Sequence, residues 1–427
     1  MKMSKIKRII IGESGGPTPV IDWEVAGMLA AARKIGIEVY GAINGLEGIL
    51  HADVPGNIVN LTPIDPTQFI YNGPGAGLKT TRIKPTKEQY FKMGENLNKL
   101  KIDGIIYIGG NDSADQLKGL TDEADIRAIH AIKTVDNDLQ VTHHCPGFGS
   151  AALFNATAVK NVHNDFSSYR VRGKFPDGKI GVMNAPVIVY QVMGRKAGWL
   201  AHSTAFARVD PMGQMIPGRA PHIILSKEIP FDKEKYLKEL SDTISKHGEA
   251  VVIVQEDLTE VKTRKSIAEV YGNVELDPHG NIMHGRATSF SPGVFLAQVA
   301  VKELKVEAVA QVKEAVLVPQ HIQRSHSLAL PDAAEAYLVG YKSVEALESG
   351  VTKTSVILKK EANGNMVASL TDIGNIAKKE RTVDYHYIND YFGPTQEFVD
   401  EFLPCIGGPT AIPHYSHMTM EPVVFKE

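Results

Sequence analysis

Short apolar, β-branched runs alternate with amphipathic segments through the first 150 residues, and this alternation constrains the fold more than any other feature. Runs at residues 7–11, 104–108 and 128–132 each end in a glycine or polar loop, and residues 20–34 carry a helical pattern. This order predicts βαβ units on a parallel sheet. In doubly wound sheets, the loops at the carboxyl ends of the strands line the ligand crevice. We therefore expect the three loops to converge on one site.

A second series of strand-like runs follows the first. It predicts a second α/β unit, with strands at residues 180–183, 186–192, 222–225, 250–254 and 316–318 and a helix at 197–207. Beyond about Lys353 the pattern weakens into polar, turn-rich sequence, which indicates an extension packed on the main body. A chain of 427 residues, 43% of them hydrophobic, is large enough to bury the cores of more than one domain.

The charge and the cysteines narrow the possible partners and the compartment. A formal net charge of -3 supplies no general basic field, so we expect binding to neither nucleic acid nor membrane. Cys145 and Cys405 have neither the number nor the spacing of a disulfide framework or a zinc site, which predicts structural thiols in a cytoplasmic protein. No signal-peptide core is present at the N-terminus, and no apolar run approaches the roughly 20 residues that span a bilayer.

Glycine loops follow two of the predicted strands. In Gly15-Gly16-Pro17-Thr18, backbone N–H groups and the start of the next helix can cradle a phosphate, although an ordinary tight turn explains the residues equally well. The segment 109–115 adds two carboxylates, an amide and a hydroxyl, which are the oxygen ligands that Mg²⁺ prefers beside substrate phosphates. The alternative for this segment is a capped helix start, with Asn111 or Ser113 as the N-cap.

A lysine and two carboxylates lie together in Lys133-Thr134-Val135-Asp136-Asn137-Asp138, again after a predicted strand. The lysine can neutralise charge on a transferring phosphoryl group, and a carboxylate can accept the proton of an attacking hydroxyl. A solvated polar turn is the alternative. Arg82, Arg195 and Arg324 also follow turns and suit bidentate phosphate binding, although each one alone fits a surface ion pair.

Together these segments resemble the phosphofructokinase superfamily, and within it the pyrophosphate-dependent 6-phosphofructokinases. Six motifs occur in the family's order, namely Gly15-Gly16-Pro17-Thr18, Gly109-Gly110-Asn111-Asp112-Ser113, Lys133-Thr134-Val135-Asp136-Asn137-Asp138, Pro146-Gly147-Phe148-Gly149-Ser150-Ala151-Ala152, Met193-Gly194-Arg195 and Gln323-Arg324-Ser325. The resemblance implies a homodimer or homotetramer of two doubly wound α/β domains with the active site in the cleft between them. It implies a donor domain at residues 1–150 and about 246–305, an acceptor domain at 151–245 and about 306–350, and a C-terminal extension at 351–427.

The resemblance also implies roles for individual residues. Asp136 would be the general base, Arg195 would steady the transferring group, and Asn111 would bind Mg²⁺. Asp112 and Lys133 would complete the catalytic set. The residues expected around the pyrophosphate donor are Gly15, Arg82, Asp112 and Lys133. Those expected around the sugar phosphate acceptor are Thr134, Asp136, Met193, Gly194, Arg195, Glu228, His321 and Arg324.

Asp112 and Lys133 carry the implied choice of donor, because ATP-using relatives commonly have glycine at both positions. The Asp112 carboxylate would repel the α-phosphate of ATP, whereas the smaller pyrophosphate still fits and would contact Lys133. The expected reaction is Mg²⁺-dependent, reversible phosphoryl transfer from pyrophosphate to the 1-hydroxyl of fructose 6-phosphate, in glycolysis or gluconeogenesis.

Departures from the family pattern leave the acceptor open. Asn111 replaces a common aspartate, Gln191 replaces a glutamate, and Ala315 stands where an arginine often reaches a neighbouring subunit's phosphate site. Lys313 is close to that position and offers a point charge in place of the bidentate fork. One alternative is a pyrophosphate- or ATP-dependent kinase of another sugar phosphate or of a polyol. Another is a non-catalytic regulatory paralogue, although the expected catalytic set is intact.

Overall fold

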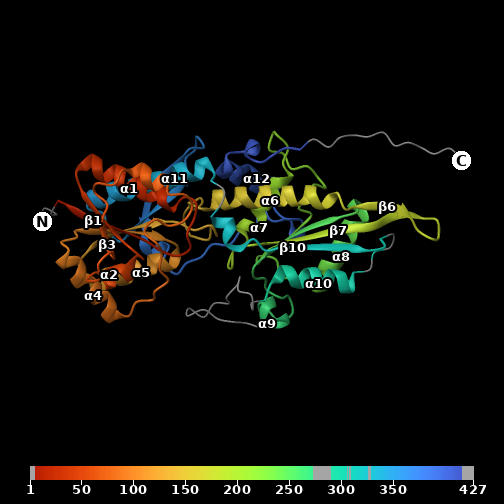
Figure 1. The fold of residues 1–427 in the computed structure, drawn as a ribbon, viewed down its shortest axis with the longest axis horizontal. Coiled ribbons are helices and arrows are strands. Elements are labelled where there is room, and N and C mark those ends of the chain that lie inside the picture. Colours follow the sequence, from red (N-terminus) through yellow and green to blue (C-terminus); the bar gives the residue numbers. More distant parts are fainter. Residues whose placement is uncertain (1–4, 273–289, 305, 307–308, 326–327, 416–427) are drawn as a thin grey trace.

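Two β-sheets, each covered by helices on both faces, form the body of the protein (Figure 1). The computed structural model describes residues 5–272, 290–304, 306, 309–325 and 328–415. Within them, the first sheet has the strand order β12-β11-β5-β4-β1-β2-β3. Its strands are β1 (Arg8–Glu13), β2 (Glu38–Ala42), β3 (Ile58–Asn60), β4 (Gly104–Gly109), β5 (Arg127–Ile132), β11 (Thr354–Lys360) and β12 (Met366–Asp372).

The central strands of the first sheet are parallel, and β3 and β12 are antiparallel strands at its edges. Because β4 is buried on both faces, its sequence is a nearly continuous apolar run rather than an alternating one. Helices α1 (Ile21–Ile35), α3 (Pro66–Ile70) and α11 (Leu330–Glu348) cover one face. Helices α2 (Leu46–Leu50), α4 (Lys87–Lys99) and α5 (Asn111–Glu123) cover the other.

The second sheet has the order β10-β7-β9-β8, with β6 beside β7. Its strands are β6 (Val171–Lys174), β7 (Ile180–Val192), β8 (Ile223–Leu225), β9 (Ala250–Gln255) and β10 (Val312–Leu317). Helices α8 (Lys233–His247) and α10 (Pro292–Glu303) pack on one face, and α6 (Phe148–Ser167) and the region of α7 (Trp199–Ser203) and η1 (Thr204–Arg208) pack on the other. The remaining helices are α9 (Ile267–Tyr271), η2 (Gln320–Arg324), η3 (Ile373–Asn375), η4 (Tyr385–Tyr387), η5 (Asp390–Phe392), α12 (Gln396–Phe402), η6 (Leu403–Ile406) and η7 (Pro409–Ala411).

The chain passes between the two units more than once. It enters the second unit through α6, returns with α11, which packs along α1, and adds β11 and β12 to the first sheet (Figure 1). The last described segment then packs α12 against α6 and α7, where Trp199, Phe398 and Phe402 join one aromatic cluster. Among the described helices, none has the length and apolar character that crossing a membrane requires.

The observed architecture confirms the predicted pair of α/β units but differs from the predicted boundaries. Strand β9 lies in residues 246–305, which the family resemblance assigned to the donor domain, yet it hydrogen-bonds to β7 and β8 in the second sheet, as the strand pattern predicted. Helix α11, expected in the second unit, packs on α1. The segment from residue 351 does not merely pack on the body, because β11 pairs with β5 and extends the first sheet. An apolar run identifies a buried strand without identifying its partner strand.

Candidate active site

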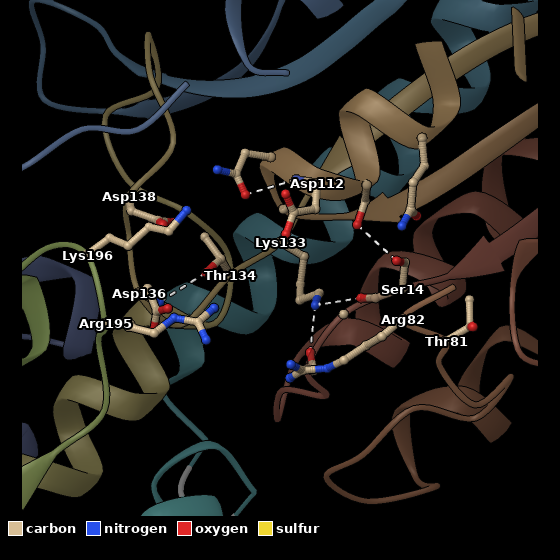
Figure 2. Close-up of a pocket in the computed structure, with 16 residues that line it drawn as sticks. Ser14, Thr81, Arg82, Asp112, Lys133, Thr134, Asp136, Asp138, Arg195 and Lys196 are labelled. Atoms are coloured by element: carbon tan, nitrogen blue, oxygen red, sulfur yellow. Dashed lines mark hydrogen bonds between the residues drawn. The ribbon is translucent and has the colours of Figure 1, made fainter. Parts of the chain in front are cut away.

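A pocket opens where the loops after β1, β4 and β5 meet the loop after β7 (Figure 2). The expected convergence of the three first-unit loops is therefore observed, and the second unit supplies the remaining wall. The pocket is lined by Ser14, Gly15, Gly16, Thr81, Arg82, Gly110, Asn111, Asp112, Ser113, Gln116, Lys133, Thr134, Asp136, Asp138, Arg195 and Lys196.

Lys133 lies beneath the glycine turn and is fixed by it. Its Nζ atom donates hydrogen bonds to the carbonyl oxygens of Ser14 at 2.9 Å and Gly16 at 2.6 Å. Between them, Gly15 has a φ of 74°, a left-handed conformation that glycine adopts without strain. Burial lowers the pKa of Lys133 to about 8, while the charge of Glu24 opposes this shift. A cation is thus held at the floor of the turn with little freedom to move.

Helix α5 begins at the pocket and presents its N-terminus to it. Gly110 is the N-cap and offers no side chain to the N–H groups of the first turn, of which the Asp112 N–H is bonded to Asn111 Oδ1; a helix N-terminus can bind an anion through the others. Ser113 in that turn donates to Ser14 at 2.9 Å between the two Oγ atoms, which ties α5 to the glycine turn. The interpretation as a helix start holds, with Gly110 rather than Asn111 or Ser113 as the N-cap, and the segment also lines the pocket, whereas its role in binding Mg²⁺ stays a prediction.

Asn111 and Asp112 face different surroundings at the start of α5. The Asn111 Oδ1 atom accepts from the Asp112 N–H at 2.9 Å, and its Nδ2 atom donates to Glu380 Oε1 at 3.1 Å. The Asp112 side chain is exposed at the pocket wall (Figure 2). A carboxylate and an amide oxygen are therefore available on one side of the pocket.

Asp136 lies across the pocket, beside Arg195 (Figure 2). Its N–H donates to Thr134 Oγ1 at 3.1 Å, which fixes the loop after β5. Burial raises the pKa of the Asp136 carboxyl, and the charges of Arg195, Arg324 and Lys133 oppose the rise. A desolvated carboxylate among cations is a reasonable proton acceptor at a reaction site.

Asp138 is a second buried carboxylate in the same loop. Burial, together with the neighbouring charges of Asp136 and Glu380, raises the pKa of Asp138 to about 7. The alternative of a solvated turn for residues 133–138 does not hold, since Lys133 and Asp138 are both buried.

Several residues expected at the acceptor lie outside the pocket wall. The described residues that line the pocket do not include Met193, Gly194, Glu228, His321 and Arg324. Gly194 has a φ of 107° and turns the chain so that Arg195 enters the pocket. The remaining four are engaged in contacts of their own.

Met193 and Glu228 support the chain around the pocket. The Met193 N–H donates to Gln323 Oε1 at 3.1 Å. Glu228 Oε1 accepts from the N–H groups of Gly198 at 2.9 Å and Val383 at 3.0 Å, so this carboxylate holds two distant segments together.

Arg324 reaches from the second unit to the glycine turn of the first. Its Nη2 atom donates to His321 Nδ1 at 2.7 Å, and its Nη1 atom lies 2.3 Å from where a Cβ atom on Gly16 would stand. Residue 16 therefore has to be glycine for Arg324 to keep this position. In this structure Arg324 neighbours the turn expected to hold the donor.

The structure also shows the surroundings of residues 191 and 315, which depart from the family pattern. Gln191 is buried, and its Oε1 atom accepts from Ser291 Oγ at 2.8 Å and the Gly293 N–H at 3.0 Å, so it holds the start of α10. Ala315 lies in β10, and nearby Lys313 places its Nζ atom 3.5 Å from the centre of the Tyr169 ring.

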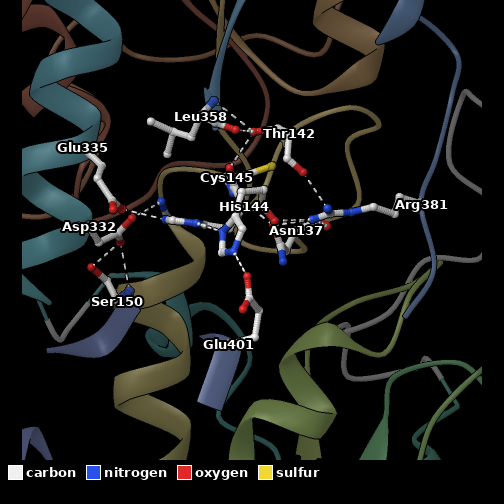
Figure 3. Close-up of polar contacts among 12 residues, drawn as sticks. Asn137, Thr142, His144, Cys145, Ser150, Asp332, Glu335, Leu358, Arg381 and Glu401 are labelled. Atoms are coloured by element: carbon white, nitrogen blue, oxygen red, sulfur yellow. Dashed lines mark hydrogen bonds and ion pairs between the residues drawn. The ribbon is translucent and has the colours of Figure 1, made fainter. Parts of the chain in front are cut away.

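Arg381 and Glu380, in the polar C-terminal stretch, were not anticipated from the sequence. Arg381 donates to the carbonyl oxygens of Thr142 at 2.5 Å and His143 at 3.1 Å, and to both oxygens of Asn137 (Figure 3). Its guanidinium also stacks on Trp199 at 4.5 Å. Glu380 pairs with Lys196 at the pocket wall. Arg381 thus holds residues 137–143 of the loop after β5, and Glu380 contacts the loop after β7.

Arg381→Ala is expected to lower the free energy of unfolding by about 3 kcal/mol or more, because the buried carbonyl groups of residues 137 and 142 lose a charged donor. Urea denaturation measures the change. Arg172→Ala, which removes an exposed arginine on β6, is the matched control and should stay within about 0.5 kcal/mol of the unsubstituted protein. Equal effects of the two substitutions would contradict the bracing role.

Comparison with known proteins places these observations in context. The sequence profile of the family described as Phosphofructokinase matches residues 8–347. A pyrophosphate–fructose 6-phosphate 1-phosphotransferase from Rhodospirillum rubrum is 30% identical over 415 residues, which cover 94% of this chain and 94% of that protein.

Two crystal structures resemble the whole fold. A pyrophosphate-dependent phosphofructokinase from Marinobacter aquaeolei has a TM-score of 0.75 and 26% identity, with 99% of this chain and 98% of that chain covered. The corresponding protein from Nitrosospira multiformis has a TM-score of 0.74 and 27% identity, with 94% and 92% covered.

Proposed function

The chain belongs to the phosphofructokinase family, and on that premise we propose that it transfers a phosphoryl group from pyrophosphate to the 1-hydroxyl of fructose 6-phosphate. The products are fructose 1,6-bisphosphate and phosphate. The observation that carries the proposal is the meeting of Asp112, Lys133 and Asp136 in one pocket between the two units. The activity named for the similar protein of Rhodospirillum rubrum supports it.

The donor side of the pocket suits a compact polyanion. The glycine turn, the N-terminus of α5, Arg82 and the buried Lys133 all surround the same space. Such a set of fixed dipoles and cations stabilises charge on a transferring phosphoryl group. The exposed Asp112 carboxylate repels a further phosphate, which favours pyrophosphate over a nucleoside triphosphate.

Asp136 and Arg195 act on the acceptor side of the proposed reaction. The Asp136 carboxylate takes the proton of the acceptor hydroxyl as the hydroxyl oxygen attacks the terminal phosphorus of pyrophosphate. The bond from that phosphorus to the bridging oxygen breaks, and phosphate leaves. Arg195 and Lys133 lie in the same pocket and neutralise charge on the group in transfer.

The pocket also offers a donor set that fits Mg²⁺. Asp112, Asp136, Asp138 and the Asn111 amide line it, and all of them offer oxygen, the ligand atom that Mg²⁺ prefers. Asp112 and the predicted ligand Asn111 would hold the ion beside the pyrophosphate. When bound, Mg²⁺ would neutralise phosphate charge and orient the donor. A cytoplasmic homodimer or homotetramer that works in either direction in glycolysis or gluconeogenesis belongs to the same proposal.

The donor assignment predicts that kcat/KM with pyrophosphate exceeds that with ATP by about 100-fold or more, because opposed like charges cost several kcal/mol. Initial rates with fructose 6-phosphate and Mg²⁺ measure the ratio. Asp112→Asn keeps the side-chain shape and removes the charge, so it should raise kcat/KM with ATP and narrow the ratio. Asp115 lies one turn further along α5 and pairs with Lys378 outside the pocket. Asp115→Asn should therefore leave the ratio of the two kcat/KM values unchanged. Equal rates with both donors in the unsubstituted protein would refute the assignment.

The acceptor is tested separately, since Ala315 departs from the family pattern. A panel of sugar phosphates and polyols is assayed with pyrophosphate as the donor. Fructose 6-phosphate should give the highest kcat/KM, and a higher value for another acceptor would replace the substrate while keeping the reaction type.

A further inference from the structure

Two consecutive histidines form a buried cluster on the far side of the loop that follows Asp138. His143 and His144 face each other, with 2.8 Å between their Nδ1 atoms. The Sγ atom of Cys405 joins them, and one ligand atom from each of the three residues lies within 4.8 Å of the others. The exposed fractions of the two histidine side chains are only 14% and 1%.

The outer nitrogen of each ring contacts a carboxylate. His143 Nε2 lies 2.6 Å from Glu401 Oε1, and His144 Nε2 lies 2.6 Å from Glu335 Oε2. Figure 3 shows Glu335 and Glu401 on different sides of the cluster. Because ionised carboxylates only accept hydrogen bonds, these contacts put a proton on each Nε2 atom. Metal-binding histidines usually have this arrangement, in which a carboxylate orients the ring through the nitrogen that does not bind the metal.

The inner nitrogens are then left facing each other without hydrogen. A neutral imidazole that carries its proton on Nε2 has a lone pair on Nδ1, so the two Nδ1 atoms would point lone pairs at each other across 2.8 Å. A positive centre between them removes the repulsion. One extra proton between the two Nδ1 atoms would do so as well, whereas a metal ion would in addition engage the Cys405 sulfur, which lies within 4.8 Å of a nitrogen of each ring.

We propose that His143, His144 and Cys405 bind one zinc ion through their Nδ1, Nδ1 and Sγ atoms. Zinc favours tetrahedral nitrogen and sulfur ligands at about 2.0–2.1 Å and 2.3 Å, which places two nitrogen ligands about 3.3 Å apart. The two rings therefore need to separate by only about half an ångström from their present 2.8 Å. Water fills the fourth position.

This site differs from the expectation that neither cysteine belongs to a zinc site. The sequence shows no zinc-binding motif at these residues, because more than 250 residues separate His144 from Cys405. The fold brings them together by packing η6 and α12 beside the loop that starts at β5. The ion would join this loop to the C-terminal segment, with Glu335 of α11 as an oriented outer contact.

The full-length protein, stripped with chelator, tests the proposal by its uptake of Zn²⁺ alone. After incubation with excess Zn²⁺ and desalting, elemental analysis should find one zinc per chain. Co²⁺ in place of Zn²⁺ should give the absorption of tetrahedral cobalt together with a sulfur-to-cobalt charge-transfer band. The cobalt spectrum needs no substitution, so it reports the sulfur ligand even where a variant fails to fold.

Variants of the ligands supply the controls. Cys405→Ala should lose both the zinc equivalent and the charge-transfer band, and His143→Ala should lose the zinc equivalent. Cys145→Ala, which changes the other buried cysteine outside the cluster, should keep both. The absence of stoichiometric zinc from the unsubstituted protein, or a cobalt spectrum without the sulfur band, would overturn the proposal. Zinc content that survives in folded Cys405→Ala would do the same.

Discussion

Asp136→Asn is expected to lower kcat for phosphoryl transfer by about 100- to 10,000-fold, the range over which a positioned general base contributes. Asparagine keeps the shape of the side chain but cannot take the proton of the acceptor hydroxyl. Because the charges of Arg195 and Lys133 remain, KM for both substrates should change far less than kcat. Steady-state rates in the direction of fructose 1,6-bisphosphate formation measure both constants.

Asp115→Asn serves as the control for this change. It removes a carboxylate of the same unit whose partner, Lys378, lies outside the pocket, so kcat should stay near that of the unsubstituted protein. Thermal unfolding of both variants checks that the fold is intact. A folded Asp136→Asn protein whose kcat falls by less than about tenfold would assign the base to another group, and Asp138 would be the first to examine.

Lys133→Met is the second large effect and should lower kcat/KM for pyrophosphate by about 100- to 1,000-fold, as loss of one preorganised charge-stabilising group does. Methionine approximates the length of the lysine stem and removes the ammonium group that bonds to the carbonyl oxygens of Ser14 and Gly16. The glycine turn should loosen as well, which costs about 1–3 kcal/mol of stability for the unsatisfied carbonyl groups. Initial rates and urea denaturation separate the two losses.

The control for lost charge is Lys118→Met, an exposed position on α5, which should leave kcat/KM unchanged. The pH profile gives an independent check. With a pKa of about 8, Lys133 is charged below this pH and neutral above it, so kcat/KM should fall as the pH rises through about 8. Arginine stays charged at these pH values, and Lys133→Arg should therefore lose this fall even if its rate is lower. Persistence of the fall in that variant would assign it to another group.

The local sequence identified those strands that are buried on both faces and therefore consist of apolar residues. Residues 104–108 and 128–132 correspond to β4 and β5 within one residue at each end, because such strands need continuous apolar side chains. The sheet to which a strand belongs depends on distant partners. The strand pattern placed β9 in the second unit, where it lies, whereas the domain bounds implied by the resemblance did not, and β11 was not recognised as a strand of the first sheet.

The same division applies to the pocket. Lys133 and Asp136 follow a strand directly, so their position at the sheet edge could be inferred from the residues before them. Arg381 contacts Thr142 in the loop after β5 across more than 230 residues, and nothing in the sequence beside Arg381 indicates this contact. Gln191 was noted from the sequence only as a departure from the family pattern, and the structure adds that its amide oxygen holds the start of α10.

The repeated passage of the chain between the two units has a consequence for synthesis on the ribosome. The glycine turn, Lys133 and Asp136 emerge early. Helix α11, which packs on α1, and strand β11, which pairs with β5, emerge only after the strands of the second sheet. Domains generally fold as units while the chain grows from its N-terminus. Here the first unit lacks α11 on one face and β11 at the edge of its parallel strands until residues 330–360 have been added.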